Sequence, residues 1–152
     1  MADPVAQMNI DCSSLDAVYF FATPKIFRKK AGMFEPPLFQ EFFEFYVRRF
    51  YELCVYLEAR AGTKQIKIYF PSSVYVSARP RGMSEYAMAK AAAEVLIEEI
   101  NKSFNKLSVL STRLPRLNTD QTSSIVKIST ESNVEALLPI IRSLNKKDAR
   151  PN

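Results

Sequence analysis

Histidine and tryptophan are absent from this sequence of 152 residues, and glycine and cysteine are scarce. Without histidine, a His-based catalytic triad and most zinc sites are excluded, and we predict no metal site. The two cysteines, Cys12 and Cys54, lie far apart and are typical of buried or free thiols in a reducing compartment. Because the sequence has neither a signal peptide nor a long apolar run, we expect no membrane partner and a cytoplasmic location.

The composition is that of a globular protein with one core, since 47% of the residues are hydrophobic and 24% are charged. The length favours a single domain over residues 1–152, with its core over about residues 15–145. The formal net charge is +5, but the basic residues are scattered over separate segments and no nucleic-acid-binding motif accompanies them. We therefore expect solvated surface charge and no nucleic-acid partner.

Hydrophobic periodicity predicts strands and helices that alternate along the chain. Leu15–Ala22 is short and rich in aromatic residues, as expected of a strand that is buried on both faces. Alternation of this kind predicts an α/β fold with a parallel sheet, right-handed crossovers and helices packed on the sheet. The predicted strands are Leu15–Ala22, Gln65–Pro71 and Leu107–Thr112, and the predicted helices are Leu38–Arg60, Glu85–Phe104 and Ser132–Leu144.

The ends of these helices have recognisable signals. Pro36–Pro37 suits a helix start, and Ser84 has the character of an N-cap. Ser132 and Glu135 have capping-box spacing at the start of the last helix. Pro139, inside that helix, predicts a kink or an early break.

Three polar residues around the second predicted strand carry the chemistry. Tyr86 and Lys90 are four residues apart at the start of a helix, so they share one face. Ser73 is thirteen residues before Tyr86 and is expected just past the end of a strand, where open α/β sheets place their ligands. The spacing predicts that the three side chains converge on one crevice, with Ser72 as the alternative if the register is off by one.

This constellation resembles the short-chain dehydrogenase/reductases, which carry a serine after the fifth Rossmann strand and then a Tyr-x-x-x-Lys motif on the next helix. Ser73, Tyr86 and Lys90 stand in those positions. The resemblance covers about residues 15–122 and implies a partial Rossmann-like parallel sheet, from the fourth strand onward. It also implies a ketoreductase-like hydride transfer between a nicotinamide cofactor and a carbonyl or alcohol, with Ser73, Tyr86 and Lys90 as the catalytic residues.

The same resemblance indicates residues that would contact NAD(P)H. Ala22 is kept from the Asn-Asn-Ala-Gly that usually ends the fourth strand, and Lys90 belongs to both the catalytic and the cofactor-binding sets. Pro115 and Thr119 match the proline and threonine that frame the nicotinamide carboxamide. Tyr46 falls where many members of the family have an active-site asparagine.

The family's glycine-rich phosphate loop has no counterpart, because Gly32, Gly62 and Gly82 are widely separated and none follows an N-terminal strand. The sequence therefore resembles the C-terminal, catalytic half of a reductase. We expect NAD(P)H to bind only if the missing N-terminal Rossmann half is supplied. The expected partners are that half or further copies of the chain, and a small-molecule or carrier-bound carbonyl substrate.

In the implied mechanism, Tyr86 is the general acid for ketone reduction and Lys90 lowers its pKa from the ordinary value of about 10. Ser73 hydrogen-bonds the substrate oxygen. An alternative hypothesis is a non-catalytic dimerisation or interaction module derived from a reductase fold, in which the tyrosine and lysine are relics. A third is an unrelated basic α/β binding protein.

Overall fold

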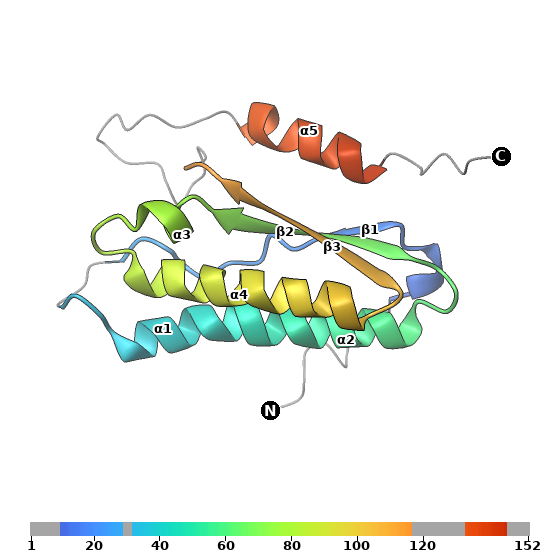
Figure 1. Ribbon diagram of the computed structural model, residues 1–152, viewed down its shortest axis with the longest axis horizontal. Coiled ribbons are helices and arrows are strands. Elements are labelled where there is room, and N and C mark those ends of the chain that lie inside the picture. The colour runs from blue at the N-terminus through green and yellow to red at the C-terminus, as the bar shows by residue number, and fades with distance from the viewer. Residues whose placement is uncertain (1–9, 29–31, 117–132, 146–152) are drawn as a thin grey trace.

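A computed structural model describes residues 10–28, 32–116 and 133–145. Three strands, β1 (Ala17–Tyr19), β2 (Ile66–Ser73) and β3 (Leu107–Leu114), form a parallel sheet in that order. Long helices cover one face of the sheet and a shorter helix lies over the other (Figure 1). The predicted α/β class and parallel sheet are confirmed, and the arrangement is consistent with a partial Rossmann-like fold.

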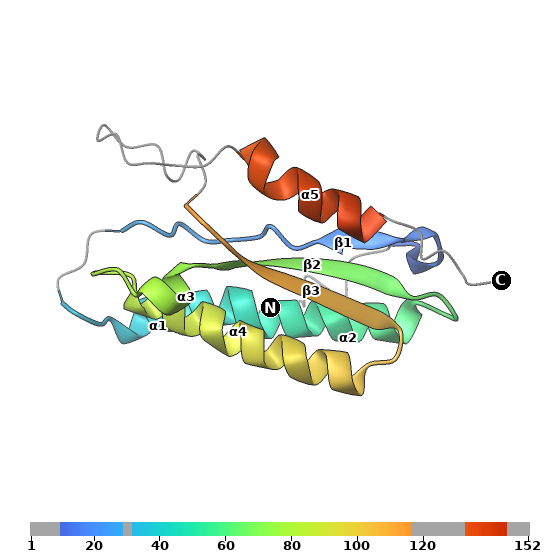
Figure 2. The same ribbon diagram turned by 45° about the horizontal axis from the view of Figure 1, so that its top comes forward.

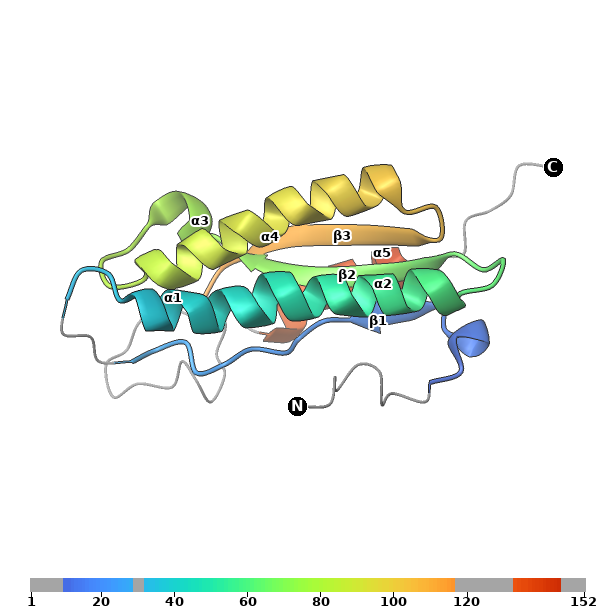
Figure 3. The ribbon, with the colours of Figure 1, turned by 90° about the horizontal axis from the view of Figure 1, so that it is seen from below.

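The helical layer consists of two long rods that lie side by side beneath the sheet (Figure 3). One rod runs from α1 (Pro36–Phe43) through a π-helical segment (Glu44–Arg49) into α2 (Phe50–Arg60). It begins at the two prolines, as predicted, because proline suits the first helical positions where no amide donor is needed. The second rod is α4 (Ser84–Ser103).

The main core lies between these rods and β2 and is unusually rich in aromatic rings. Phe42, Tyr46, Phe50 and Phe70 are each at most 1% exposed. The rings of Phe50 and Phe70 are 4.7 Å apart in an edge-to-face arrangement, which adds to the gain from burying their area. Cys54 is also fully buried, as predicted, and both cysteines are free thiols.

The strand boundaries differ from the predicted ones. Strands β2 and β3 each run two residues further, because their ladder continues to the pair Ser73 and Leu114. Strand β1 is shorter, and its residues are only partly buried, so the prediction of a strand buried on both faces is wrong. The reason is its place at the edge of the described sheet, where it pairs with β2 alone.

Two predicted helix signals also change. Met83, not Ser84, is the N-cap residue of α4, because the Ser84 hydroxyl donates instead to the carbonyl of Met33 at 3.1 Å. Helix α5 (Asn133–Asn145) continues through Pro139 without the predicted early break, and the capping residue Ser132 lies outside the described residues.

Two short elements complete the described fold, a 3-10 turn at Cys12–Ser14 and α3 (Tyr75–Ala78), which lies between β2 and α4. From the side, α5 runs along the sheet on the face opposite α1, α2 and α4 (Figure 2). Among the described residues, no helix combines the length and the apolar character that crossing a membrane requires.

Candidate active site

The end of β2 and the start of α4 hold the three predicted catalytic side chains. Ser73 is the last residue of β2, Tyr86 lies in the first turn of α4, and Lys90 follows one turn later. Ser73 lies near the Tyr86 hydroxyl and acts to lower its pKa, and the Lys90 ammonium is 5.8 Å from the centroid of the Tyr86 ring. The structure therefore brings all three together at the carboxyl end of a parallel strand.

The Ser73 hydroxyl is held by a second contact. Its oxygen accepts the backbone N–H of Tyr75 at 3.2 Å, which fixes its position at the point where the chain turns into α3. The Tyr75 ring also lies edge-on to the Tyr86 ring, with centroids 6.2 Å apart. Ser73 and Tyr86 are each 8% exposed, so a small part of the pair is in contact with solvent.

Lys90 is buried among aromatic rings, a surrounding that we call the aromatic box and define by Tyr46, Phe70 and Tyr86. Its ammonium lies 3.8 Å from the Tyr46 centroid and 4.5 Å from that of Phe70, distances typical of cation–π contacts. It donates one short hydrogen bond, 2.6 Å, to the carbonyl of Pro71. Only 4% of the residue is exposed, so water contributes little to solvating the charge.

Burial shifts the pKa values of both Lys90 and Tyr86. Desolvation lowers the pKa of Lys90 to about 7, against a smaller opposing effect of the Glu94 charge. Desolvation raises the pKa of Tyr86 to about 12, although the neighbouring Ser73 side chain acts to lower it. The resemblance implied a lowered pKa for Tyr86, but the pKa is raised, because the effect of burial is larger than that of Ser73.

Tyr46 occupies the position at which the resembled family has an asparagine. Its ring forms one wall of the aromatic box, and its hydroxyl makes a short hydrogen bond to the Thr23 hydroxyl. Burial raises the pKa of this phenol far above its ordinary value, so it stays protonated. Tyr46 therefore supplies packing around Lys90 where the asparagine would supply an amide.

A charged cluster beside the site was not predicted from the sequence, and we call it the Glu94–Arg113 bridge. Glu94 accepts a 2.5 Å hydrogen bond from the Ser72 hydroxyl and two more, at 2.9 and 2.6 Å, from the Arg113 guanidinium. Arg113 also donates to the Ser77 hydroxyl at 2.5 Å. The bridge engages the Ser72 hydroxyl, whereas Ser73 is the serine that acts on the pKa of Tyr86. A sequence signal existed, since Glu94 lies one helical turn beyond Lys90.

Of the predicted cofactor-binding residues, Ala22, Lys90 and Pro115 are among those that the structure describes. Ala22 is exposed on the segment that follows β1, Pro115 directly follows β3, and Thr119 lies outside the described residues. The resemblance assigns these positions, with Lys90, to the nicotinamide end of a dinucleotide. They do not fit its pyrophosphate, because the chain has no glycine-rich turn whose amides could hold it.

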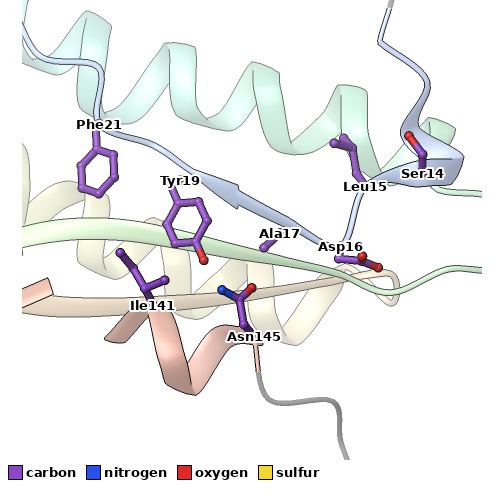
Figure 4. A pocket seen from close by; sticks show the side chains of 8 residues that line it. All are labelled: Ser14, Leu15, Asp16, Ala17, Tyr19, Phe21, Ile141 and Asn145. Atoms are coloured by element: carbon purple, nitrogen blue, oxygen red, sulfur yellow. The ribbon is translucent and has the colours of Figure 1, made fainter. Parts of the chain in front are cut away.

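Two hollows lie elsewhere on the described structure, and neither is lined by Ser73, Tyr86 or Lys90. One, of about 500 Å³, lies between β1 and α5, where the Tyr19 ring points across toward Ile141 and Asn145 (Figure 4). The Tyr19 hydroxyl is buried there and has no hydrogen-bond partner among the residues that the structure describes. The other, of about 1100 Å³, adjoins α3 and the start of α4.

The fold and the site together define an α/β domain with a Ser–Tyr–Lys set at the carboxyl ends of its parallel strands. The sequence matches no model of a known protein family, and a search of curated proteins finds no match. Within the described residues, no group of three or more acidic or cysteine side chains is placed to hold a metal ion. The chemistry of the site is therefore argued from its own residues.

Proposed function

We propose that this chain is the catalytic half of an NAD(P)-dependent oxidoreductase that interconverts a carbonyl and an alcohol. The observation that carries the proposal is the buried pair Ser73 and Tyr86 at the end of β2, with the buried Lys90 ammonium 5.8 Å from the Tyr86 ring centroid. A buried lysine without a carboxylate directly against its ammonium costs stability. Ionisable groups shifted in this way gather at functional sites, where their chemistry offsets that cost.

Each residue has a defined role in this proposal. Ser73 donates a hydrogen bond to the substrate oxygen and stabilises the negative charge that develops on it. Tyr86, a phenol with a raised pKa, is protonated near neutrality and gives its proton to the forming alkoxide. Lys90, whose ammonium is 5.8 Å from the Tyr86 ring centroid, supplies positive charge that favours the phenolate left behind.

NAD(P)H supplies the hydride when it is bound. Because this chain offers no phosphate-binding turn, the pyrophosphate would be held by a second polypeptide segment that carries one. The edge of β1 that does not face β2 is the position at which further parallel strands would pair, beside the hollow of Figure 4. The substrate would be a small-molecule or carrier-bound carbonyl that reaches Tyr86 from the strand ends.

The test combines the full chain with a separately expressed, glycine-rich N-terminal half of a ketoreductase, NADPH and a β-keto ester, and follows the absorbance of NADPH. We expect turnover, with a loss of about 10² to 10⁴-fold on Tyr86→Phe. The control is Tyr51→Phe, which alters an exposed tyrosine of α2 and should leave the rate unchanged. An assembled complex that binds NADPH but shows no turnover would contradict the proposal.

A second candidate, an interaction module that pairs with another copy of the chain, is favoured by apolar side chains on the outside of the two rods. Tyr51 and Val55 of α2 and Met88 and Val95 of α4 are each more than 40% exposed. In this case Val95→Glu should convert a dimer to a monomer in sedimentation experiments, while Tyr86→Phe should leave the mass unchanged. A wild-type monomer at high concentration would rule this candidate out.

A further inference from the structure

The larger hollow has walls of a different character from the Ser73–Tyr86 site. It lies among the segment around Met33, helix α3, the loop that leads to Gly82, and the first turns of α4. Of the described residues that line it, three are arginines and none is acidic. The other lining residues are mostly apolar or small: Gly32, Met33, Val76, Pro80, Gly82, Ser84, Ala87, Met88 and Ala91.

Two of the three arginines are free to bind a ligand. Arg28 is engaged in a two-pronged contact with Glu41, at 2.7 and 2.6 Å. Arg79 and Arg81 are exposed and form no ion pair with any residue that the structure describes. The nearby acid Glu85 is buried and already accepts the backbone N–H of Glu35 at 2.6 Å. The hollow therefore combines uncompensated positive charge with an apolar wall.

The backbone places Arg79 in an unusual way. Its φ of +46° lies in the left-handed region, which non-glycine residues rarely adopt, and its amide is held by the Tyr75 carbonyl at 3.0 Å. This turn ends α3 and directs the chain along the rim of the hollow toward Arg81. Strained positions of this kind cluster at ligand-binding sites.

We propose that this hollow binds a small amphipathic anion. A carboxylate or phosphate head would pair with Arg79 and Arg81, because guanidinium groups match both anions with two parallel hydrogen bonds. A short alkyl body would cover Val76, Ala87 and Met88, and Met88 is now 48% exposed. The proposal stands apart from the reductase chemistry, since Ser73, Tyr86 and Lys90 do not line this hollow.

The experiment titrates the full chain with octyl phosphate, octanoate, 1-octanol and inorganic phosphate, and follows binding by NMR and calorimetry. We expect octyl phosphate to bind more tightly than 1-octanol, which lacks the charge, and more tightly than inorganic phosphate, which lacks the apolar body. The octanoate arm distinguishes a carboxylate ligand from a phosphate ligand. Equal binding of octyl phosphate and inorganic phosphate would overturn the proposal, as would no binding of either amphipathic anion.

Matched variants locate the site. The pair Arg79→Asn and Arg81→Gln should weaken octyl phosphate binding about fivefold to tenfold, since exposed charge pairs contribute modestly, and should leave 1-octanol unaffected. Asparagine is chosen because it tolerates a left-handed backbone. The control pair, Arg60→Gln and Lys102→Gln, removes the same charge away from the hollow and should change nothing. An equal loss in both pairs would show attraction to net charge alone and would overturn the proposal.

Discussion

Two residues of opposite charge on consecutive turns of α4, Lys90 and Glu94, have very different surroundings. Lys90 lies in the aromatic box with a single carbonyl as its hydrogen-bond acceptor, and burial lowers its pKa to about 7. Glu94, one turn later, keeps partial contact with solvent, and Arg113 and Ser72 hold its pKa below the usual value. Lys90 is therefore only partly protonated near neutral pH, whereas Glu94 is fully ionised there.

Under the proposed function, this contrast separates a catalytic position, Lys90, from a structural one, Glu94. A protein that needed only packing at position 90 would gain stability from an apolar residue there, because the contacts of the ammonium within the described structure are a carbonyl and aromatic rings and not a carboxylate. The Glu94–Arg113 bridge instead joins α4 to β3 and to the ends of β2 and α3 through hydrogen bonds. The bridge supports the strand end that carries Ser73, and the aromatic box sets the charge beside it.

The largest expected effect comes from opening the aromatic box. Tyr46→Ala removes a ring that is 1% exposed, so we expect a loss of roughly 4 kcal/mol in the free energy of unfolding, measured in urea. Water would also reach Lys90, and its pKa should rise toward the ordinary value for lysine, as followed by NMR. The exposed ring of Tyr51 is the control, and Tyr51→Ala should cost much less. If the unfolding free energies of the two variants fell equally, the box would not be a buried cluster.

The second effect is a gain in stability on removing the buried charge. Lys90→Met keeps the length of the side chain but not its charge. Because the pKa of Lys90 is about 7 in the folded protein and 10.5 ordinarily, the folded state must bear the desolvated charge below pH 7. This penalty fades as the pH rises from 7 to 10.5, since there the unfolded chain binds a proton that the folded chain does not.

We therefore expect Lys90→Met to be more stable than the wild type by about 3 kcal/mol at pH 6, with the difference shrinking by pH 10. Urea unfolding at both pH values measures it. The control is Lys102→Met, an exposed lysine near the end of α4, whose effect should not change between the two pH values. A wild type that is more stable than Lys90→Met at pH 6 would show that the lysine is not penalised by burial.

The smallest effect is expected at the bridge. Glu94→Gln removes the charge that Arg113 contacts and should cost about 1 kcal/mol near neutral pH. Because the pKa of Glu94 is lowered in the folded state, this contribution is present above pH 4.5 and is lost as the pH falls. The control Glu99→Gln breaks only an exposed pair with Lys102 and should leave stability unchanged.

Glu94→Gln also tests whether the charge of Glu94 affects the pKa of Lys90. The Glu94 charge acts to raise the pKa of Lys90, so its removal should lower that pKa further, as measured by NMR. An unchanged Lys90 pKa would show that the aromatic box and the bridge act independently. A lowered pKa would show that the bridge sets the fraction of Lys90 that is charged near neutrality.

Much of the fold could be predicted from local patterns. The three strands, the two rods and the α/β class follow from apolar periodicity, and the meeting of Tyr86 with Lys90 follows from helical spacing. The strand ends could not be predicted, because the ladder of β2 and β3 continues wherever both backbones can pair, whatever their side chains. Likewise, Ser84 has the chemistry of an N-cap, but a competing carbonyl, that of Met33, takes its hydroxyl.

The sequence by itself determined which functional groups this protein brings to one end of a parallel sheet: a serine, a tyrosine and a lysine at fixed spacing. Only the tertiary structure decided their protonation. The rings of Tyr46 and Phe70 come from distant parts of the chain and exclude water from Lys90, whereas Arg113 crosses from β3 to pair with Glu94. A pKa depends on the solvent and charges that surround a group in space, and these are set by packing and not by neighbours in sequence.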